Sequence, residues 1–205
     1  ASGDHQIWSE RKPVVVSQIV EEDSDVVGLQ EAYQSTGNSS GSVNQYTDLR
    51  NGLNAAGKPF ELTDTNKDAS RATRIIYNTS TVQLNSQGSF KYANQVSGST
   101  DRFLVWATFT QKSTGKKFFF ANTHLSPNSS TVKKKEWQEL IPKIRELNTA
   151  SLPVLAVGDF NTSKFGAEAE EMLPAMKAAG FGDVMNQEYK VNPPRSPRGE
   201  VVVDG

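Results

Sequence analysis

Residues 153–161 read PVLAVGDFN, a short apolar run followed directly by a turn that carries an acidic and an amide side chain. The run at 153–157 has the pattern of a strand that is buried on both faces. Glycine, aspartate and asparagine then interrupt the pattern, as they do where a strand ends. We therefore predict a buried strand with Asp159 and Asn161 at its carboxyl end.

Two further apolar runs end in a similar way. Residues 26–29 (VVGL) precede Glu31, and residues 118–121 (FFFA) precede His124. Strand ends of a layered α/β protein meet at one rim, which is where ligands usually bind. We therefore expect Glu31 and His124 to lie near Asp159.

Helical and strand patterns alternate in the remaining sequence. The clearest helix covers 133–148, where apolar residues recur three and four positions apart. Another helix is expected over 13–23, with Pro13 in its first turn. Further helices are expected around 46–53 and 172–179, and further strands at 60–62, 74–77, 81–84, 89–92 and 103–109. Since no linker divides the chain, we predict an α/β protein with a single domain over residues 1–205.

Composition excludes several classes of protein. Of the 205 residues 36% are hydrophobic and 22% are charged, as in a globular protein, and no apolar run approaches the ~18 residues of a membrane span. The absence of cysteine excludes disulfides, thiolate zinc sites and cysteine nucleophiles. The net charge of −1 gives no global positive field for nucleic acid, although a local basic face is compatible with it.

Each strand-end residue also has an ordinary structural explanation. A glutamate in the place of Glu31 is most often solvated, and Asp159 has the setting of a turn former. His124 is compatible with a core histidine, and Asn161 begins a glycosylation sequon, N-T-S. The combination favours function, because two carboxylates, an imidazole and an amide suit a hard cation and a phosphate oxyanion.

Three motifs together resemble the endonuclease/exonuclease/phosphatase superfamily, which includes deoxyribonuclease I, abasic-site endonucleases, neutral sphingomyelinases and inositol polyphosphate phosphatases. The motifs are DVVGLQE at 25–31, NTHL at 122–125 and GDFN at 158–161. Their order and surroundings match as well, so the resemblance extends from Trp8 to Asn161 and beyond.

The resemblance implies a four-layer α/β/β/α sandwich of two mixed sheets flanked by helices. It also implies that water attacks a phosphoester with the help of Mg²⁺, or of Mn²⁺ in its place. Glu31 and Asp159 would bind the metal, and His124 would donate a hydrogen bond to a non-bridging phosphate oxygen. Asp159 and Asn161 would orient the nucleophile and the scissile phosphate.

Two parts of the family pattern are missing from these 205 residues. They are a first strand that carries an asparagine and a Ser-Asp-His segment that supplies the general base. His5 lies at the wrong end of the chain to replace that histidine. We therefore expect a domain that is incomplete at both ends and, taken alone, a poor catalyst. The alternative is a non-catalytic domain that keeps a phosphate- or cation-binding rim.

The sequence leaves the substrate open. A nuclease or another phosphodiesterase is the leading hypothesis, and a lipid or inositol phosphoesterase is an alternative. The basic run at 133–135 is expected on the solvated side of its helix. Arg74 is a candidate for substrate binding, because arginine contacts phosphate through two hydrogen bonds. Arg71, Arg195 and Arg198 are further candidates.

Composition also bears on the compartment of the protein. Several stretches are rich in Ser, Thr, Asn and Gln, which is typical of exported proteins, so secretion is expected. They lie at 35–45, 78–89 and 94–100. No feature of the sequence specifies an oligomeric state. The expected partner is therefore the phosphoester substrate, with nucleic acid as one form of it.

Overall fold

The computed structural model describes residues 7–32, 34–35, 43–64, 72–162 and 167–182. The chain divides into two compact units, 1–162 and 163–205, and every strand of the described residues belongs to the first. In the second unit, helix α4 (Ala167–Ala178) matches the helix expected around 172–179. The prediction of a single domain remains a prediction. His5, Arg71, Arg195 and Arg198 lie outside the described residues.

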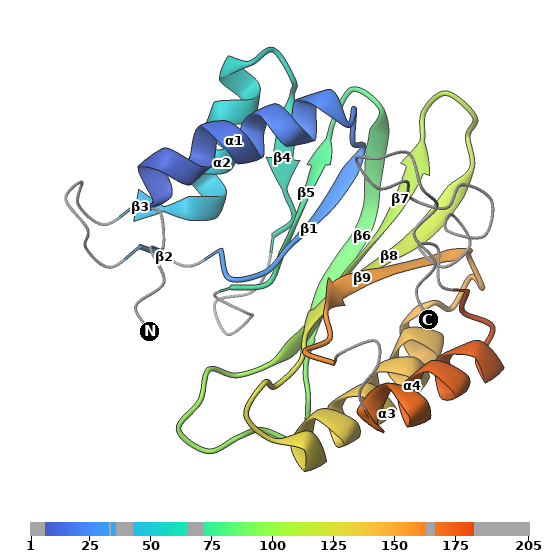
Figure 1. The fold of residues 1–205 in the computed structure, drawn as a ribbon. Coiled ribbons are helices and arrows are strands. Elements are labelled where there is room, and N and C mark those ends of the chain that lie inside the picture. The colour runs from blue at the N-terminus through green and yellow to red at the C-terminus, as the bar shows by residue number, and fades with distance from the viewer. Residues whose placement is uncertain (1–6, 33, 36–42, 65–71, 163–166, 183–205) are drawn as a thin grey trace, which may run out of the picture. The chain divides into compact units, whose positions relative to one another are not determined.

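The first sheet has three antiparallel strands in the order β1-β5-β4 (Figure 1). The strands are β1 (Val26–Leu29), β5 (Arg74–Asn78) and β4 (Phe60–Leu62). Helices α1 (Trp8–Glu21) and α2 (Gln45–Ala55) cover one face of this sheet. A buried apolar cluster joins the helices to the sheet, and its members are Ile19, Leu49, Leu53, Phe60 and Ile76. A short ladder pairs β2 (Gln34–Ser35) with β3 (Val43–Asn44).

Helix α1 begins earlier than the sequence indicated. It starts at Trp8, so Pro13 lies inside the helix and its predicted place in the first turn is wrong. The reason is a tertiary contact with α2. The Asp48 carboxylate accepts hydrogen bonds from Trp8 Nε1 at 2.8 Å and from Lys12 Nζ at 2.6 Å, which holds the residues before the proline in helical form.

The second sheet has four strands in the order β6-β7-β8-β9. They are β6 (Val82–Lys91), β7 (Phe103–Gln111), β8 (Lys117–His124) and β9 (Val154–Asp159). Strands β6 to β8 are antiparallel, and β8 and β9 are parallel and joined through helix α3 (Ser130–Leu147). The two strands predicted at 81–84 and 89–92 form the single strand β6, because a shift of register between Leu84 and Ser86 absorbs the irregular sequence.

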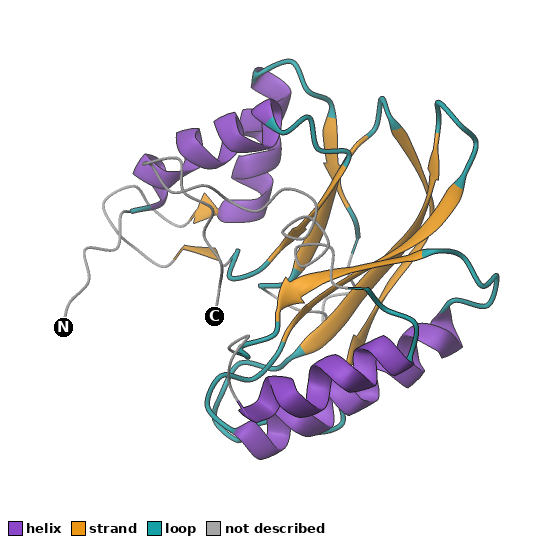
Figure 2. Ribbon diagram, turned by 45° about the vertical axis from the view of Figure 1, so that its right-hand side comes forward, coloured by secondary structure: helices purple, strands orange, loops and turns teal. Residues whose placement is uncertain are grey.

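The two sheets pack face to face around an apolar core. Alternate residues of β7, Val105, Ala107 and Phe109, are fully buried and cluster with Ile75 of the first sheet and Phe120 of β8. Helix α3 lies against the other face of the four-stranded sheet (Figure 2). This order of layers confirms the predicted α/β/β/α sandwich. No helix among the described residues is both long and apolar enough to cross a membrane.

Candidate active site

The parallel strands β8 and β9 end at the same level. Their last register pair joins His124 to Asp159, and His124 Nε2 lies 3.7 Å from Asp159 Oδ2. The His124 side chain is 3% exposed and that of Asp159 is 50% exposed. The structure therefore brings these two predicted site residues together, with the imidazole beneath the surface and the carboxylate open to solvent.

The turn after β9 places Asn161 against both strands. Asn161 N donates to Asp159 Oδ1 at 2.8 Å, and Asn161 Nδ2 donates to the carbonyl oxygen of Leu125 at 2.7 Å. Asn161 is in the left-handed region, with φ of 48°. Gly158 approaches β8 so closely that a Cβ there would lie 2.2 Å from the Thr123 carbonyl oxygen, which requires glycine in this motif.

Glu31 follows a strand of the other sheet and lies within electrostatic reach of His124. It follows β1 by two residues, is exposed, and has a φ of 55°, which is uncommon for glutamate. Its charge, like that of Asp159, raises the pKa of His124. We call Glu31, His124, Asp159 and Asn161 the rim residues. Two of them are left-handed residues other than glycine, a strain that is often found at functional sites.

Asn122 is the first residue of the NTHL motif, had no predicted role, and holds the two sheets together beneath the rim residues. Its fully buried side chain donates to the carbonyl oxygens of Leu29 at 3.0 Å and Arg74 at 2.7 Å. It also accepts a hydrogen bond from Gln30 Nε2 at 2.5 Å. Asn122 therefore fixes the segment that leads to Glu31 relative to the strand that ends in His124.

Gly28 allows this approach of the two sheets. A Cβ at this position would lie 2.6 Å from Val157 Cγ2 and 2.8 Å from the side-chain Cγ of Asn122. Any larger residue would push the sheets apart or displace the asparagine. The glycine of the first motif is thus explained by packing between the sheets.

Burial governs the protonation of the imidazole. Burial lowers the pKa of His124, and the nearby Arg102 charge lowers it further, whereas the carboxylates of Asp159 and Glu31 act in the opposite direction. The net direction is downward from the ordinary value of 6.5. Nδ1 is buried and has no hydrogen-bond partner among the described residues. His124 is therefore neutral at pH 7, with one ring nitrogen able to donate.

Arg74 opens strand β5 and pairs in register with Leu29 of β1, close to the segment that carries Glu31. Its guanidinium lies over the ring of Tyr46, 4.5 Å from the centroid, and Nη2 donates to the tyrosine hydroxyl at 3.3 Å. Its Nε is buried and has no partner among the described residues. The structure thus places Arg74 at the same end of the first sheet as the segment leading to Glu31.

Lys133 and Glu136 at the start of α3 were not predicted as part of the site. Lys133 is 5% exposed and Glu136 is 0% exposed, so the expected solvated position of residue 133 is wrong. Both residues precede Trp137 on the buried side of the helix, by four positions and by one. That helical phase is the signal in the sequence that could have identified them.

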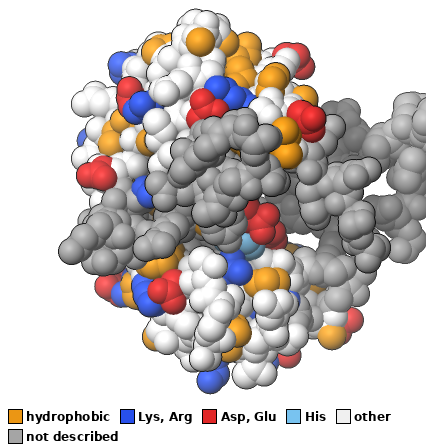
Figure 3. Space-filling model, turned by 90° about the vertical axis from the view of Figure 1, so that its left-hand side faces the viewer, with side chains coloured by type: hydrophobic (Ala, Val, Ile, Leu, Met, Phe, Trp, Pro, Cys, Tyr) orange, Lys and Arg blue, Asp and Glu red, His pale blue; other side chains and the backbone are white. Residues whose placement is uncertain are grey.

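Two carboxylates of the rim residues are suitable ligands for a divalent metal ion. Mg²⁺ commonly binds one or two carboxylates and keeps several waters, and Glu31 and Asp159 offer such a donor set on two strand ends. Within the part of the chain that the structure describes, no three His, Asp or Glu side chains are arranged so that together they could hold a metal ion. Acidic side chains lie beside a histidine on the face shown in Figure 3, and His124 is the one histidine described.

Comparison with known proteins identifies the fold. The profile of the endonuclease/exonuclease/phosphatase family matches residues 8–200. Among solved structures, a mannosyl-6-phosphatase from Bacteroides thetaiotaomicron shares 22% identity with a TM-score of 0.68, covering 82% of this chain and 62% of that one. The human Nocturnin catalytic domain, with bound sulfate, shares 17% identity with a TM-score of 0.64, covering 86% and 64%.

A third structure, TDP2 of D. rerio complexed with a single-strand DNA product, shares 21% identity with a TM-score of 0.65. The match covers 94% of this chain and 68% of that one. At these identities the likeness concerns the fold alone. The chain spans less than two thirds of the length of the first two structures. Comparison with curated protein sequences gives no match.

Proposed function

Since the chain belongs to the endonuclease/exonuclease/phosphatase family, whose members hydrolyse phosphoesters, we propose that it is a metal-dependent phosphodiesterase, most simply a nuclease. The observation that carries the proposal is the paired end of β8 and β9. There, His124 Nε2 lies 3.7 Å from Asp159 Oδ2, and the pKa of the imidazole responds to the charge of Glu31 from the other sheet. Two acidic side chains within electrostatic reach of a neutral hydrogen-bond donor suit a phosphate bound to a cation.

In this proposal Glu31 and Asp159 hold Mg²⁺, with Mn²⁺ as a substitute. The bound ion would neutralise charge on the phosphate and lower the pKa of a water molecule. Glu31 presents its carboxylate from an exposed, left-handed position, and Asp159 is held by its bond from Asn161 N. Among the described residues, neither carboxylate forms an ion pair with lysine or arginine.

His124 would act as a hydrogen-bond donor to a non-bridging phosphate oxygen. A donor aimed at developing negative charge lowers the barrier most where water is excluded, and this imidazole is almost completely buried. Asn161 uses Nδ2 to bind Leu125, which leaves its side-chain oxygen to orient the nucleophilic water. These roles divide charge stabilisation and orientation between two neighbouring strand ends.

Arg74 and Tyr46 support a nucleic-acid phosphodiester as the substrate class. A guanidinium stacked on an aromatic ring offers both a phosphate contact and a flat surface, and proteins that bind single strands combine these two features. Because the net charge is −1, we expect a nucleic acid to contact the protein only near the rim residues and not along a broad basic surface. Secretion of the protein remains a proposal that the composition alone supports.

Hydrolysis of bis(p-nitrophenyl) phosphate by the full-length protein tests this function. We expect turnover with Mg²⁺ or Mn²⁺, its loss with EDTA, and a loss of about 10²-fold or more in Glu31→Gln. Glu61→Gln is a matched control, because Glu61 lies in the same sheet and pairs with Arg50 at 3.4 Å on the surface. Turnover that survives both EDTA and Glu31→Gln would overturn the proposal.

A second assay separates the substrate classes. A short single-stranded DNA and p-nitrophenyl phosphate are compared under the same conditions, with Arg74→Lys beside the wild type. Lysine keeps the charge but loses the planar fork, so cleavage of the DNA should fall about tenfold while its metal dependence is unchanged. Preferential hydrolysis of the monoester would instead identify a phosphatase.

A further inference from the structure

Helix α3 buries two charged side chains in its first two turns. Lys133 is 5% exposed and Glu136 is completely buried. They are three residues apart and so lie on the same side of the helix. Buried lysine and glutamate are rare unless their charged groups are satisfied by specific partners. Each of the two side chains binds a residue of a loop that follows His124 or Asp159.

Glu136 binds the loop after His124. Its carboxylate accepts hydrogen bonds from Ser126 N at 2.7 Å and from Ser126 Oγ at 2.6 Å. Register pairing of β8 with β9 ends at His124, so Ser126 N lies beyond the ladder. Glu136 thus supplies the acceptor that a neighbouring strand would otherwise provide, and it does so two residues from the imidazole.

Lys133 binds the loop after Asp159. Its Nζ donates to the carbonyl oxygen of Asn161, whose own side chain donates to the Leu125 carbonyl oxygen at 2.7 Å. Leu125 N in turn donates to the Asp159 carbonyl oxygen at 2.9 Å. The two loops are therefore tied to each other and, through two adjacent positions of one helix face, to α3.

Charge links the same helix to the imidazole. The buried Arg102 guanidinium lowers the pKa of both His124 and Glu136, so it lies within electrostatic reach of both groups. Burial has the larger effect on Glu136 and raises the pKa of its carboxyl. Burying an acid at this position costs free energy, and a hydrophobic residue would pack the helix without that cost. Packing alone therefore does not explain Glu136.

We propose that Glu136, with Lys133 one turn before it, is a positioning residue that sets the orientation of His124 relative to Asp159 and Asn161. The expected effect on kcat rests on the proposed function, whereas the expected effect on the orientation of His124 does not. Only the hydrogen-bonding capacity of residue 136 matters for positioning. A glutamine at 136 can accept from Ser126 N through its oxygen and donate to Ser126 Oγ through its amide.

Kinetics of Glu136→Ala and Glu136→Gln in the full-length protein test the effect on turnover. A misplaced imidazole should lower kcat about 10- to 100-fold with KM within about twofold, because the substrate is still bound. Glu136→Gln should restore kcat to within about threefold of the wild type. Asn148→Ala is the control, since Asn148 also makes two bonds to the backbone, with Leu152, but at the other end of α3.

An NMR readout keeps the test independent of activity. The ring signals of His124 should shift in Glu136→Ala, return towards the wild-type position in Glu136→Gln, and stay unchanged in Asn148→Ala. If Glu136→Ala does not fold, Ser126→Ala removes one of the two bonds without a charge and should give a smaller change in the same direction. Unchanged His124 signals in the folded variants would overturn the proposal. An inactive wild-type protein with shifted signals would overturn the proposed function alone.

Discussion

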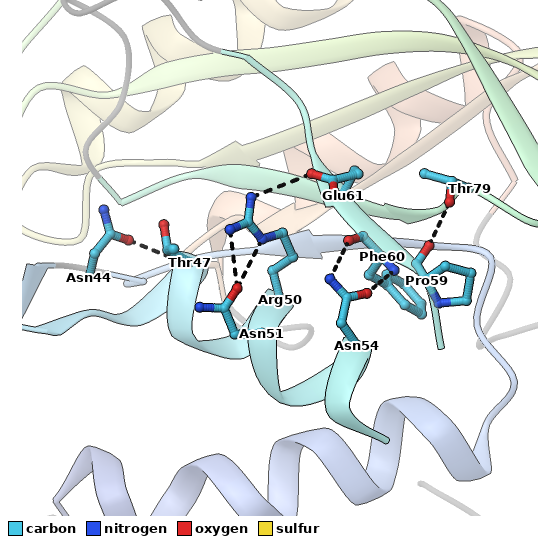
Figure 4. A network of polar contacts seen from close by, with 9 residues as sticks. All are labelled: Asn44, Thr47, Arg50, Asn51, Asn54, Pro59, Phe60, Glu61 and Thr79. Carbon is cyan, nitrogen blue, oxygen red and sulfur yellow. Dashed lines mark hydrogen bonds and ion pairs between the residues drawn. The ribbon is translucent and has the colours of Figure 1, made fainter. Parts of the chain in front are cut away.

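Asn54 and Asn122 are two asparagines that each bind backbone atoms, and they serve different purposes. Asn54 of α2 donates to the Phe60 carbonyl oxygen at 3.2 Å and accepts from Phe60 N at 2.8 Å (Figure 4). It therefore closes a turn between two residues that are six positions apart. Asn122 binds Leu29 and Gln30, which lie 93 and 92 residues away in the sequence. It therefore joins two sheets.

The neighbours of each asparagine extend this contrast. Around Asn54 the polar contacts are mostly local: Asn44 accepts from Thr47 N at 3.1 Å and caps α2, and Arg50 binds Asn51 next to it (Figure 4). Such contacts stabilise one element and leave the position of distant segments unchanged. Around Asn122 the contacts set where the rim residues lie. Long-range buried polar contacts therefore mark the candidate site more clearly than the number of hydrogen bonds does.

The largest effect expected from this contrast concerns His124. In His124→Ala, kcat should fall by about 10²-fold or more, because one donor to the developing charge is lost. Asn54→Ala should leave kcat unchanged within about twofold, since its bonds close a turn between α2 and β4. Steady-state kinetics on the diester substrate measure both. Equal losses in the two variants would break the distinction between the turn and the rim residues.

Asn122→Ala should give the largest loss of stability. The substitution removes the donor to the carbonyl oxygens of Leu29 and Arg74 and leaves a gap where the buried amide stood, so the free energy of unfolding should fall by about 2–3 kcal/mol. Asn54→Ala, at a partly exposed turn, should lower it by about 1 kcal/mol. Urea unfolding measures both values. Asn122→Ala should also lower kcat, and a stability loss with full activity would show that the sheets are positioned by other contacts.

The strands and the local motifs could be predicted from the sequence, because each depends on neighbouring residues. The runs before Glu31, His124 and Asp159 are strands, and the three motifs identified the family. The start of α1 and the role of Asn122 could not be predicted, because each depends on a partner far along the chain. Asp48, for example, is 40 residues from Trp8.

The buried charges of α3 fall between these two cases. The helical phase of Glu136 predicts burial, since it adjoins Trp137 and precedes Leu140 by one turn. The partner, Ser126, is ten residues away and lies across the helix N-terminus. Only the folded loop after β8 brings its N–H and hydroxyl to the carboxylate. Sequence thus indicates that such a residue needs a partner, and the structure identifies it.

Substitutions at two glycines, one near Asn122 and one near Asn54, test the same contrast with smaller expected effects. In Gly28→Ala the new Cβ would press on Val157 and Asn122, so we expect a loss of about 1–3 kcal/mol and a lower kcat. In Gly57→Ala, near the turn of Asn54, the Cβ meets no atom within 4 Å but the backbone has φ of 83°, which costs about 1–2 kcal/mol. Thermal unfolding and kinetics together separate them, because the second variant should keep its activity.

The smallest effect is the pH dependence of the contact between α1 and α2. Burial tends to raise the pKa of the Asp48 carboxyl, but the hydrogen bonds from Lys12 and Trp8 and the lysine charge outweigh it and hold the pKa below its ordinary value of 3.8. A lowered pKa in the folded state means that the folded protein binds this proton less readily than the unfolded chain does. The stability that Asp48 adds is therefore fully present above pH 3.8 and is lost as the pH falls through the folded value.

Asp48→Asn isolates this contribution. At pH 6 the variant should be less stable than the wild type by about 1 kcal/mol, because both partners of the ion pair are partly exposed. At pH 3 the difference should be smaller, since Asp48 of the unfolded wild-type chain is largely protonated below its ordinary pKa of 3.8 while the amide does not titrate. Other titrating groups are common to both proteins and cancel in the difference.

Urea unfolding at the two pH values measures the difference in the free energy of unfolding. Activity at pH 7 should be unaffected, because these bonds join two helices that cover the face of the first sheet turned away from the four-stranded sheet. An equal difference at both pH values would mean that Asp48 acts through hydrogen bonds that its protonated form also makes.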